Sequence, residues 1–226
     1  MSNLGFRIFT DFERPSKELV NEFRELPVAN IDDNMGRISA VDSAIKPYNK
    51  SKLLGPAFTV KVPQGDNLMF HKALDLAKEG DVIVVAGFGY TERALCGEIM
   101  MNYAIMKKFA GFVIDGAIRD VDTTRGLDFP VYARGVQPNG PYKNGPGEIN
   151  VPVSVGGQVV FPGDIVIGDE DGLIFVRPEE APELIEKVKA FNNNEKNILG
   201  NLDKGIPMDR EWVDKTLNDR GCEIVE

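Results

Sequence analysis

The stretch GDVIVVAGFGYTERALCGEIMMNYAIMKKFAGFVID, residues 80–115, decides the fold. It contains two short apolar runs, residues 82–86 and 111–115, whose valines and isoleucines are typical of buried strands. Between them, a loop at 87–91 precedes a helical pattern over roughly 95–109. Two strands joined by a helix form a βαβ unit, which predicts at least partly parallel pairing with helices on a face of the sheet.

The same kinds of element continue on both sides of this stretch. A strand from about residue 57 and a helix over 67–79 precede it, and an earlier helix over 16–26 begins at the N-cap candidate Ser16. The second half changes to short strands separated by Gly, Pro and Asp, which indicates antiparallel or mixed pairing. These segments are FPVYARGV, INVPVSV, GQVVF, DIVIGDEDG and LIFV.

Helical patterns close the chain at residues 179–199 and again around Trp212. No linker is long enough to separate two domains. We therefore predict one α/β domain over residues 1–226, with βαβ units in the first half, mixed or antiparallel strands in the second, and helical extensions at both ends.

The composition narrows the function classes. Of 226 residues, 42% are hydrophobic and 27% charged, which is typical of a folded protein. A net charge of -9 argues against direct binding of nucleic acid, since a phosphate-backbone binder presents a basic face. No apolar stretch approaches the roughly 20 residues that span a bilayer, and the opening residues lack the apolar segment of a signal peptide. We expect a cytoplasmic protein that does not bind membranes.

Cysteine and histidine are too scarce for several common sites. Cys96, Cys222 and His71 cannot supply the four ligands of a structural zinc site. A nucleophilic triad would have to use His71, which we interpret as a helix-surface or core-edge residue. The catalytic groups are therefore sought among carboxylates and arginines.

The end of the second apolar run offers such groups in GAIRDVD, where Gly116 is expected to break the strand. Loops that follow neighbouring parallel strands open on one crevice, where ligands bind. Gly97 is expected at the start of the intervening helix, where unpaired N–H groups suit a carboxylate.

Arg119 and Asp120 are adjacent, so we expect their side chains to point in different directions. Asp120 suits Mg²⁺ or Mn²⁺, because such a cation commonly takes one or two protein carboxylates and completes its shell with water and substrate. Arg119 suits the developing charge of an enolate or a substrate carboxylate. The alternative is an exposed ion pair at a loop, which has no chemical role.

Three motifs occur in one order: DGAIRD, GPGEINVPVSVGG and PGDIVIGDEDG, with CGEIMMNYA upstream. Over approximately residues 28–200 the sequence resembles the family that contains 4-hydroxy-4-methyl-2-oxoglutarate aldolase and regulator of ribonuclease activity A. The resemblance implies a layered α/β sandwich assembled as a homotrimer or homohexamer. It also implies a divalent-metal aldolase that forms pyruvate from a small 2-oxo acid.

Carried onto this sequence, the resemblance implies roles for three charged residues. Asp120 matches the metal-binding aspartate, and Arg119 matches the arginine that contacts the substrate and steadies the pyruvate enolate. Glu98 lies where the family has a carboxylate that hydrogen-bonds metal-bound water.

The resemblance further implies a substrate-binding turn at Gly97, where the backbone amides of Ile99 and Met100 match those that receive the pyruvyl carboxylate. Glu195 falls near a glutamate that the family contributes from a neighbouring subunit. Its alternative is a solvated helix residue.

The expected reaction is retro-aldol cleavage of a 4-hydroxy-2-oxo acid, with oxaloacetate decarboxylation through the same enolate. A Schiff-base aldolase is disfavoured because no lysine stands at the matched positions, although Lys61 and Lys143 stay open on spacing alone. The alternative from another class is a non-catalytic regulator that binds a ribonuclease or helicase. Asp120 favours the enzyme, because the regulator branch lacks the metal-binding aspartate. A nucleotide-dependent enzyme rests only on GFGYTE and is weakly supported.

Overall fold

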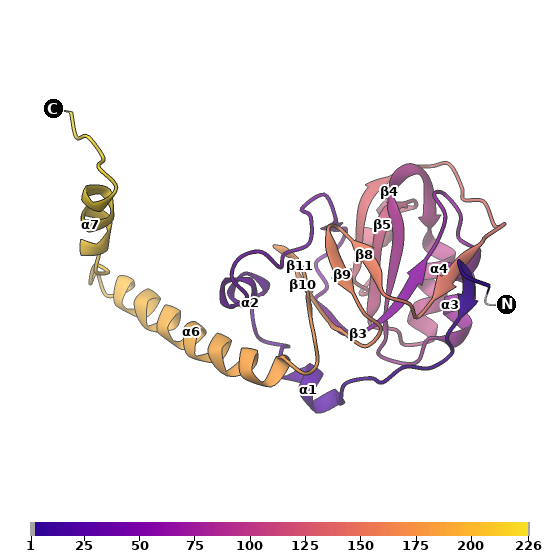
Figure 1. Ribbon diagram of the computed structural model, residues 1–226, viewed down its shortest axis with the longest axis horizontal. Coiled ribbons are helices and arrows are strands. Elements are labelled where there is room, and N and C mark those ends of the chain that lie inside the picture. Colours follow the sequence, from indigo (N-terminus) through magenta and orange to yellow (C-terminus); the bar gives the residue numbers. More distant parts are fainter. Residues whose placement is uncertain (1–2, 226) are drawn as a thin grey trace. The chain divides into compact units, whose positions relative to one another are not determined.

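The computed structural model describes residues 3–225, which form two compact units, Met1–Val188 and Lys189–Glu226. The first unit contains a nine-stranded sheet and a separate hairpin (Figure 1). The strands are β1 (Phe6–Ile8), β2 (Lys46–Pro47), β3 (Leu53–Lys61), β4 (Val82–Cys96), β5 (Gly111–Ile118), β6 (Val131–Val136), β7 (Gly147–Ile149), β8 (Val153–Val155), β9 (Gln158–Val160), β10 (Ile165–Asp169) and β11 (Gly172–Val176). The helices are α1 (Lys17–Asn21), α2 (Val28–Asn34), α3 (Leu68–Leu76), α4 (Glu98–Met106), α5 (Val121–Gly126), α6 (Ala181–Leu202) and α7 (Glu211–Asp219).

The strand order confirms the predicted α/β class. β3, β4, β5 and β6 pair in parallel, with α3 between β3 and β4 and α4 between β4 and β5. β7 and β10 pair antiparallel to β3, β11 pairs antiparallel to β10, and β1 adds in parallel to β7. The βαβ units β3–α3–β4 and β4–α4–β5 therefore come from the first half of the chain, as predicted, and β6 of the second half also pairs in parallel with β5. Each antiparallel pair among the described strands involves a strand of the second half.

The two faces of the sheet bury alternate residues of the same strands. On β4, Ile83 and Val85 belong to the core shared with α3 and α4, whereas Val82 and Val84 belong to the core shared with β8, β9 and β11. Figure 1 shows α3 and α4 on one side of β4 and β5, and β8 and β9 on the other. A strand covered on both faces must be apolar throughout, which explains the continuous run VIVVA.

A third core lies at the end of the first unit. It joins α1 and α2 to β10, β11 and the first turns of α6, where Leu184, Ile185 and Val188 are buried. Each such side chain contributes roughly 1.5–3 kcal/mol when it is fully removed from water.

Two predicted boundaries next to the candidate site are wrong. β5 does not break at Gly116 but continues to Ile118, and Gly116 is buried within it. A Cβ at Gly116 would lie 2.9 Å from Leu95 Cδ1, so this glycine permits close packing rather than a turn. The predicted loop at 87–91 is part of β4, which stays paired with β5 through register shifts after Ala86, Tyr90 and Ala94.

The helix boundaries also differ from the prediction. α1 is shorter than the predicted helix over 16–26, although Ser16 caps it as expected, its Oγ accepting the N–H of Leu19 at 3.2 Å. α4 begins at Glu98 rather than near 95, because β4 extends to Cys96. The short helices α2 and α5 were not predicted.

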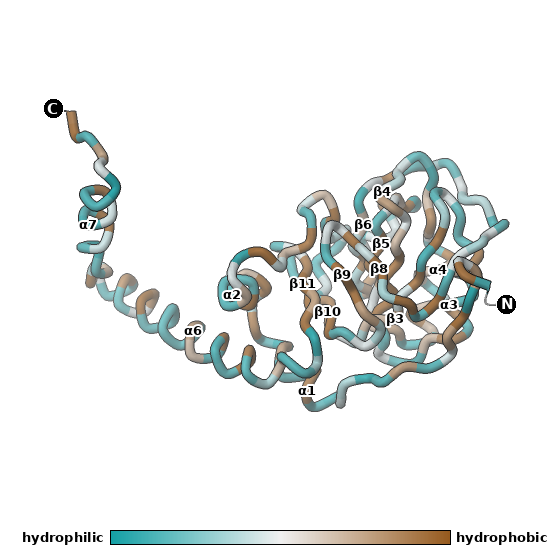
Figure 2. Tube along the Cα trace, in the orientation of Figure 1, coloured by the Kyte–Doolittle hydropathy of each residue, from teal (hydrophilic) through white to brown (hydrophobic). Residues whose placement is uncertain are grey.

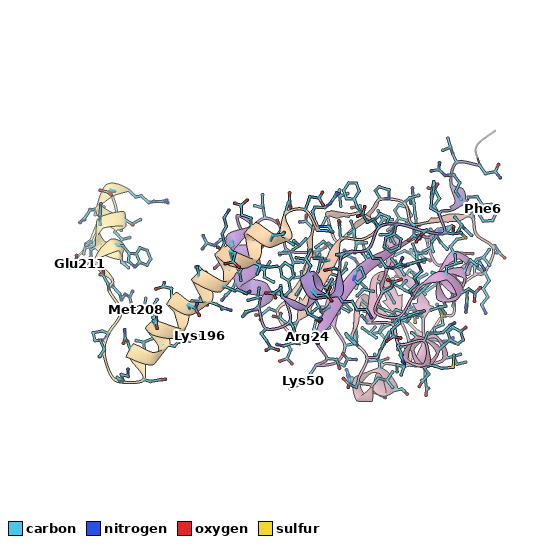
Figure 3. All side chains as sticks on the ribbon, turned by 90° about the horizontal axis from the view of Figure 1, so that it is seen from below. Phe6, Arg24, Lys50, Lys196, Met208 and Glu211 are labelled. Atoms are coloured by element: carbon cyan, nitrogen blue, oxygen red, sulfur yellow. The ribbon has the colours of Figure 1, made fainter. Side chains whose placement is uncertain are left out.

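The second unit contains the later turns of α6 and all of α7. No residue of α7 is buried within the described chain, and Trp212 is 61% exposed. Figure 2 shows hydrophobic and hydrophilic residues interspersed along both helices. Figure 3 shows the side chains, with Lys196 labelled on α6, Met208 in the connection and Glu211 on α7. The prediction of one domain over 1–226 stays a prediction. Across residues 3–225 no helix combines the length and apolarity needed to cross a bilayer.

A buried ion pair links the turn before β10 to the segment after β11. Asp164 is 2% exposed, its Oδ2 accepts the N–H of Phe161 at 2.8 Å, and its Oδ1 lies 3.1 Å from Arg177 Nε. The Arg177 contact lacks hydrogen-bond alignment, so it is mainly electrostatic. Burial raises the pKa of Asp164 from 3.8 to about 6, although the Phe161 N–H and Arg177 both oppose this shift.

This raised pKa predicts a pH dependence of stability. Between pH 4 and 6 the folded state holds a proton that the unfolded state has lost, so the stability contributed by Asp164 falls as pH rises. Relative to Asp164→Asn, the wild-type protein is expected to lose about 1 to 1.5 kcal/mol of unfolding free energy between pH 5 and pH 7.5. Denaturant titrations at both pH values measure this difference, and parallel changes in the two proteins would contradict it.

Candidate active site

Asp120 follows β5 and turns its carboxylate onto the start of α4. Its backbone is left-handed, with φ 59° and ψ 41°, a conformation that aspartate tolerates better than most residues. Its Oδ2 accepts the backbone N–H of Glu98 at 2.9 Å. The carboxylate therefore caps a helix that begins more than twenty residues earlier, and its Oδ1 accepts no hydrogen bond from residues 3–225.

Arg119 lies beside this carboxylate. Its Nε is 3.7 Å from Asp120 Oδ2, so the expectation that the two side chains point apart is wrong. The left-handed turn at Asp120 brings its side chain back toward Arg119, which an extended backbone would not do. Both side chains remain partly exposed, at 44% for Arg119 and 39% for Asp120, so the contact contributes little to stability.

Gly97 makes room for both side chains. It precedes α4, as predicted, and its extended backbone would accept any residue. A Cβ there would collide with Asp120 Oδ2 and would lie 3.0 Å from Arg119 Cγ. The glycine is therefore required for space rather than for conformational freedom.

Gly97→Ala is expected to lower catalytic efficiency by about 100-fold, since displacing reacting groups by roughly 1 Å can cost that much. The measurement is kcat/KM for pyruvate release, the activity that the family resemblance implies. Gly126→Ala is the matched control, because a Cβ at Gly126 meets nothing within 4 Å. Equal activity of the two variants would contradict the close packing at Gly97.

Gly97, Arg119 and Asp120 line a cavity of about 170 Å³. Its charged or titratable side chains are Arg119, Asp120, Lys143, His71 and the free thiol of Cys96. The remaining lining residues are Asn67, Ala94, Leu95, Gly97, Ile99, Met100 and Pro141. The cavity thus forms where β4 and β5 end, as predicted, and the start of α3 and the loop before β7 complete it.

The first turn of α4 contributes backbone donors and one carboxylate. The N–H of Met100 donates to the carbonyl of Gly97 at 3.1 Å, whereas the N–H of Ile99 donates to no acceptor among residues 3–225. Ile99 therefore offers the more accessible amide. The side chain of Glu98 is exposed and does not line the cavity, and its Oε2 lies 3.4 Å from Thr123 Oγ1.

Seven cavity residues were not assigned to the site from sequence. Ala94, Leu95 and Cys96 lie at the end of β4, Asn67 and His71 come from the start of α3, and Pro141 and Lys143 come from the loop between β6 and β7. Burial and then the nearby Lys143 ammonium lower the pKa of His71, which keeps its imidazole neutral at pH 7. The run NGPYKNGPG indicates a loop in the sequence, but no local pattern indicates that this loop forms part of the cavity wall.

The remaining predicted site residue lies elsewhere in the chain. Glu195 is on α6 in the second unit, whereas every residue that lines the cavity belongs to the first. Lys61, one of the two lysines left open for a Schiff base, does not line the cavity. Its Nζ lies 4.0 Å from Glu148 Oε2.

The fit of a divalent cation can be judged from these contacts. Residues 3–225 contain no group of three His, Cys, Asp or Glu side chains placed to hold a metal. A closed protein site is thus absent from this part of the chain. Asp120 lines the cavity, its side chain is 39% exposed, and its carboxylate suits Mg²⁺, which keeps most of its waters and needs only one or two carboxylates.

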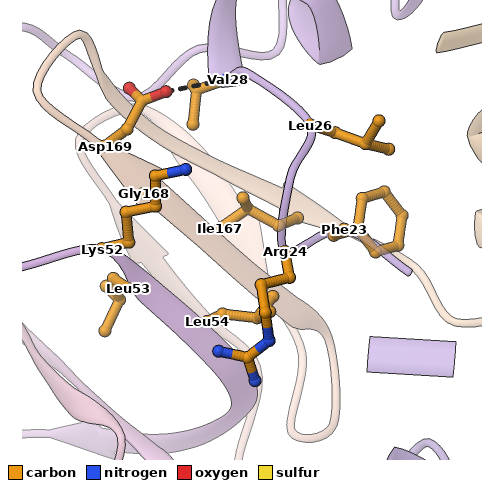
Figure 4. A pocket seen from close by; sticks show the side chains of 10 residues that line it. All are labelled: Phe23, Arg24, Leu26, Val28, Lys52, Leu53, Leu54, Ile167, Gly168 and Asp169. Carbon is orange, nitrogen blue, oxygen red and sulfur yellow. Dashed lines mark hydrogen bonds between the residues drawn. The ribbon is translucent and has the colours of Figure 1, made fainter. Parts of the chain in front are cut away.

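A second, smaller cavity of about 60 Å³ lies between the α1–α2 connection and strands β3 and β10 (Figure 4). The N–H of Val28 donates to Asp169 Oδ2 at 3.0 Å beside it. Its charged lining residues are Arg24, Lys52 and Asp169, and none of the predicted site residues reaches it. This cavity is therefore separate from the candidate active site.

Comparisons with known proteins agree with the fold. A protein of Halalkalibacterium halodurans, provisionally named a 4-hydroxy-4-methyl-2-oxoglutarate aldolase, is 39% identical over 89% of this chain and 96% of its own length. The crystal structure of an uncharacterized Pseudomonas syringae protein matches with a TM-score of 0.76 and 25% identity, over 86% of this chain and 96% of that one.

A second solved structure is described by its relation to a ribonuclease inhibitor. Streptomyces coelicolor RraAS2, described as an unusual member of the RNase ES inhibitor RraA family, matches with a TM-score of 0.73 and 28% identity, over 84% of this chain and 98% of that one. The model of the RraA-like family, described as Aldolase/RraA, matches residues 28–175. The chain therefore belongs to the RraA-like family.

Proposed function

We propose that this protein is a divalent-metal-dependent aldolase that cleaves a 4-hydroxy-2-oxo acid to pyruvate. The observation that carries the proposal is the convergence of Arg119 and Asp120 over Gly97, at the start of α4 and on the wall of one cavity. An arginine beside a carboxylate with one free oxygen suits both an enolate and a cation. The 39% identity to the provisionally named aldolase supports the same reaction class.

Asp120 is the residue that would hold Mg²⁺ or Mn²⁺, and the cation would supply Lewis-acid polarisation of the 2-keto group. The substrate carboxylate is received at the start of α4, where the N–H of Ile99 is unpaired and the N–H of Met100 is the second candidate donor. Arg119 directs its permanent charge at the enolate that develops.

The reaction balances without a further reactant. The C4 hydroxyl loses its proton to a water-assisted base, the C3–C4 bond breaks, and its electron pair forms the pyruvate enolate. For 4-hydroxy-4-methyl-2-oxoglutarate, the C4 fragment is itself pyruvate. The C3 carbon of the enolate then takes a proton from water. Glu98, to which the family resemblance gives the role of orienting that water, is exposed at the first turn of α4, beside the cavity lining rather than in it. Oxaloacetate would release carbon dioxide through the same enolate.

Glu195 extends the proposal to the assembly. α6 continues past Val188 with Ile198, Leu199 and Leu202 on spacings typical of a contact face, and Leu199 is 60% exposed. We propose that a homotrimer or homohexamer brings Glu195 to the site of a neighbouring subunit. Mixing inactive Asp120→Asn and Glu195→Gln subunits should then restore part of the activity, whereas a site built from one subunit would give no restoration.

The test of the function is pyruvate release from 4-hydroxy-4-methyl-2-oxoglutarate and from oxaloacetate, after chelation and after Mg²⁺ is restored. We expect release that depends on the cation for both substrates. Release that is unchanged by chelation would contradict the metal-dependent reaction.

The second candidate function is a non-catalytic regulator that binds a ribonuclease. It is favoured by the similarity to RraAS2, which is described as an unusual member of the RNase ES inhibitor RraA family. If the protein is a regulator, the wild-type protein and Asp120→Asn should bind the ribonuclease with equal affinity. Neither protein should then release pyruvate.

A further inference from the structure

The loop between β6 and β7 carries a cation into the cavity. Lys143 lines the cavity, is exposed, and has no ion-pair partner among the described residues. Its ammonium lies close enough to His71 to lower the pKa of that imidazole. With His71 neutral, Lys143 and Arg119 are the two cations of the cavity wall, and Arg119 is already beside Asp120.

The backbone on either side of Lys143 is fixed. The N–H of Tyr142 donates to Gly65 at 2.8 Å, and the carbonyl of Tyr142 accepts the N–H of Asn67 at 3.0 Å. The N–H of Asn144 donates to Asp66 Oδ2 at 2.6 Å, and Asp66 is 3% exposed. Lys143 is therefore anchored on both sides while its side chain remains unpaired.

Arg93 on β4 holds the same loop from outside the cavity. Its Nη1 donates to the carbonyl of Gly140 and its Nη2 to Tyr142 Oη, each at 2.8 Å. Its guanidinium also stacks on the Tyr142 ring at 4.0 Å. Arg93 does not line the cavity, so it affects the cavity only through the loop.

We propose that Lys143 binds the carboxylate at the C4 end of a dicarboxylic substrate, and that Arg93, through Tyr142 and Gly140, is the positioning residue for Lys143. The proposal rests on the proposed function for the orientation of the substrate. The pyruvyl carboxylate and the enolate use Arg119 and the start of α4. A second carboxylate in the same cavity then requires another unpaired cation, and Lys143 is the described residue that supplies it.

Two substrates that differ in this carboxylate test the proposal. 4-Hydroxy-4-methyl-2-oxoglutarate has a carboxylate on C4, and 4-hydroxy-2-oxopentanoate has hydrogen in its place. Lys143→Met is expected to lower kcat/KM for the dicarboxylic substrate by about 10-fold, mainly by raising KM. For the monocarboxylic substrate, kcat/KM should change by less than about 2-fold. Lys72→Met is the control, because Lys72 is paired with Asp75 at 3.1 Å and does not line the cavity.

Arg93→Met should have the same selective effect, and Arg93→Lys should recover part of it because lysine retains the charge and a donor. Equal losses on both substrates would show a merely structural role for the loop. No loss on either would also overturn the proposal. A third outcome is that Lys143→Met loses all turnover and that borohydride traps pyruvate on the wild-type protein. Lys143 would then form a Schiff base with the substrate instead of binding its carboxylate.

Equilibrium binding separates this proposal from the proposed function. Calorimetry with Mg²⁺ compares 2-oxoglutarate, which has a second carboxylate, with 2-oxobutyrate, which does not. Lys143→Met should weaken the binding of 2-oxoglutarate by about 10-fold and leave the affinity for 2-oxobutyrate unchanged. This result does not depend on whether the protein releases pyruvate. Equal affinities of wild type and variant for 2-oxoglutarate would overturn the role of Lys143.

Discussion

Asp120→Asn is expected to lower kcat/KM for pyruvate release by on the order of 1,000-fold. The variant removes the negative charge that we propose holds the cation. It retains the helix cap, because the amide oxygen can still accept the Glu98 N–H. Asparagine also tolerates the left-handed backbone at this position, so the fold should be unaffected.

The choice of asparagine separates chemistry from folding. Alanine at position 120 would leave a non-glycine residue at φ 59° and would remove the cap on α4, so its loss of activity would be ambiguous. Asp122→Asn is the matched control, since Asp122 is fully exposed and lies 3.4 Å from Arg125. If Asp120→Asn retained more than roughly a tenth of wild-type activity, Asp120 would not hold an essential cation.

The second large effect concerns stability. Arg14→Ala is expected to lower the free energy of unfolding by about 3–5 kcal/mol, because it leaves a buried carboxylate without its cation. Asp81 is fully buried, and Arg14 binds both of its oxygens with Nε and Nη2, each at 2.7 Å. The N–H of Lys78 supplies a third hydrogen bond at 2.8 Å, which cannot neutralise the charge.

A double variant isolates the cause. Arg14→Met combined with Asp81→Asn removes both charges, so it should be more stable than Arg14→Ala alone, although it loses the bidentate contact. Urea denaturation of the single and double variants gives the comparison. A loss below about 1 kcal/mol in Arg14→Ala would show that the segment before α1 contributes little to the fold.

The parallel half of the fold was predictable because its signal is local. VIVVA and GFVI are buried on both faces, so each reads as a short continuous apolar run. The boundaries were not predictable, since Gly116 looks like a break but packs against Leu95, and residues 87–91 look like a loop but stay in β4. In both cases a contact between strands overrides the local preference of glycine.

The candidate site was predictable as far as its residues adjoin the strands. Arg119, Asp120 and Gly97 meet at the ends of β4 and β5, but neither the left-handed turn that brings the two charges together nor the cap from Asp120 to Glu98 has a local sequence signal. Lys143 could not be placed in the same way. Its position follows from hydrogen bonds of the loop to residues about fifty to eighty positions away in the sequence.

The most direct test of the central claim is deuterium exchange at the pyruvate methyl group, followed by proton NMR in D₂O with Mg²⁺. Enolate formation at this site exchanges the C3 protons whatever the natural 4-hydroxy-2-oxo acid is. We predict that the wild-type protein removes the methyl signal and that Asp120→Asn leaves it intact. A folded wild-type protein that leaves the signal unchanged would contradict the enolate chemistry on which the proposed function depends.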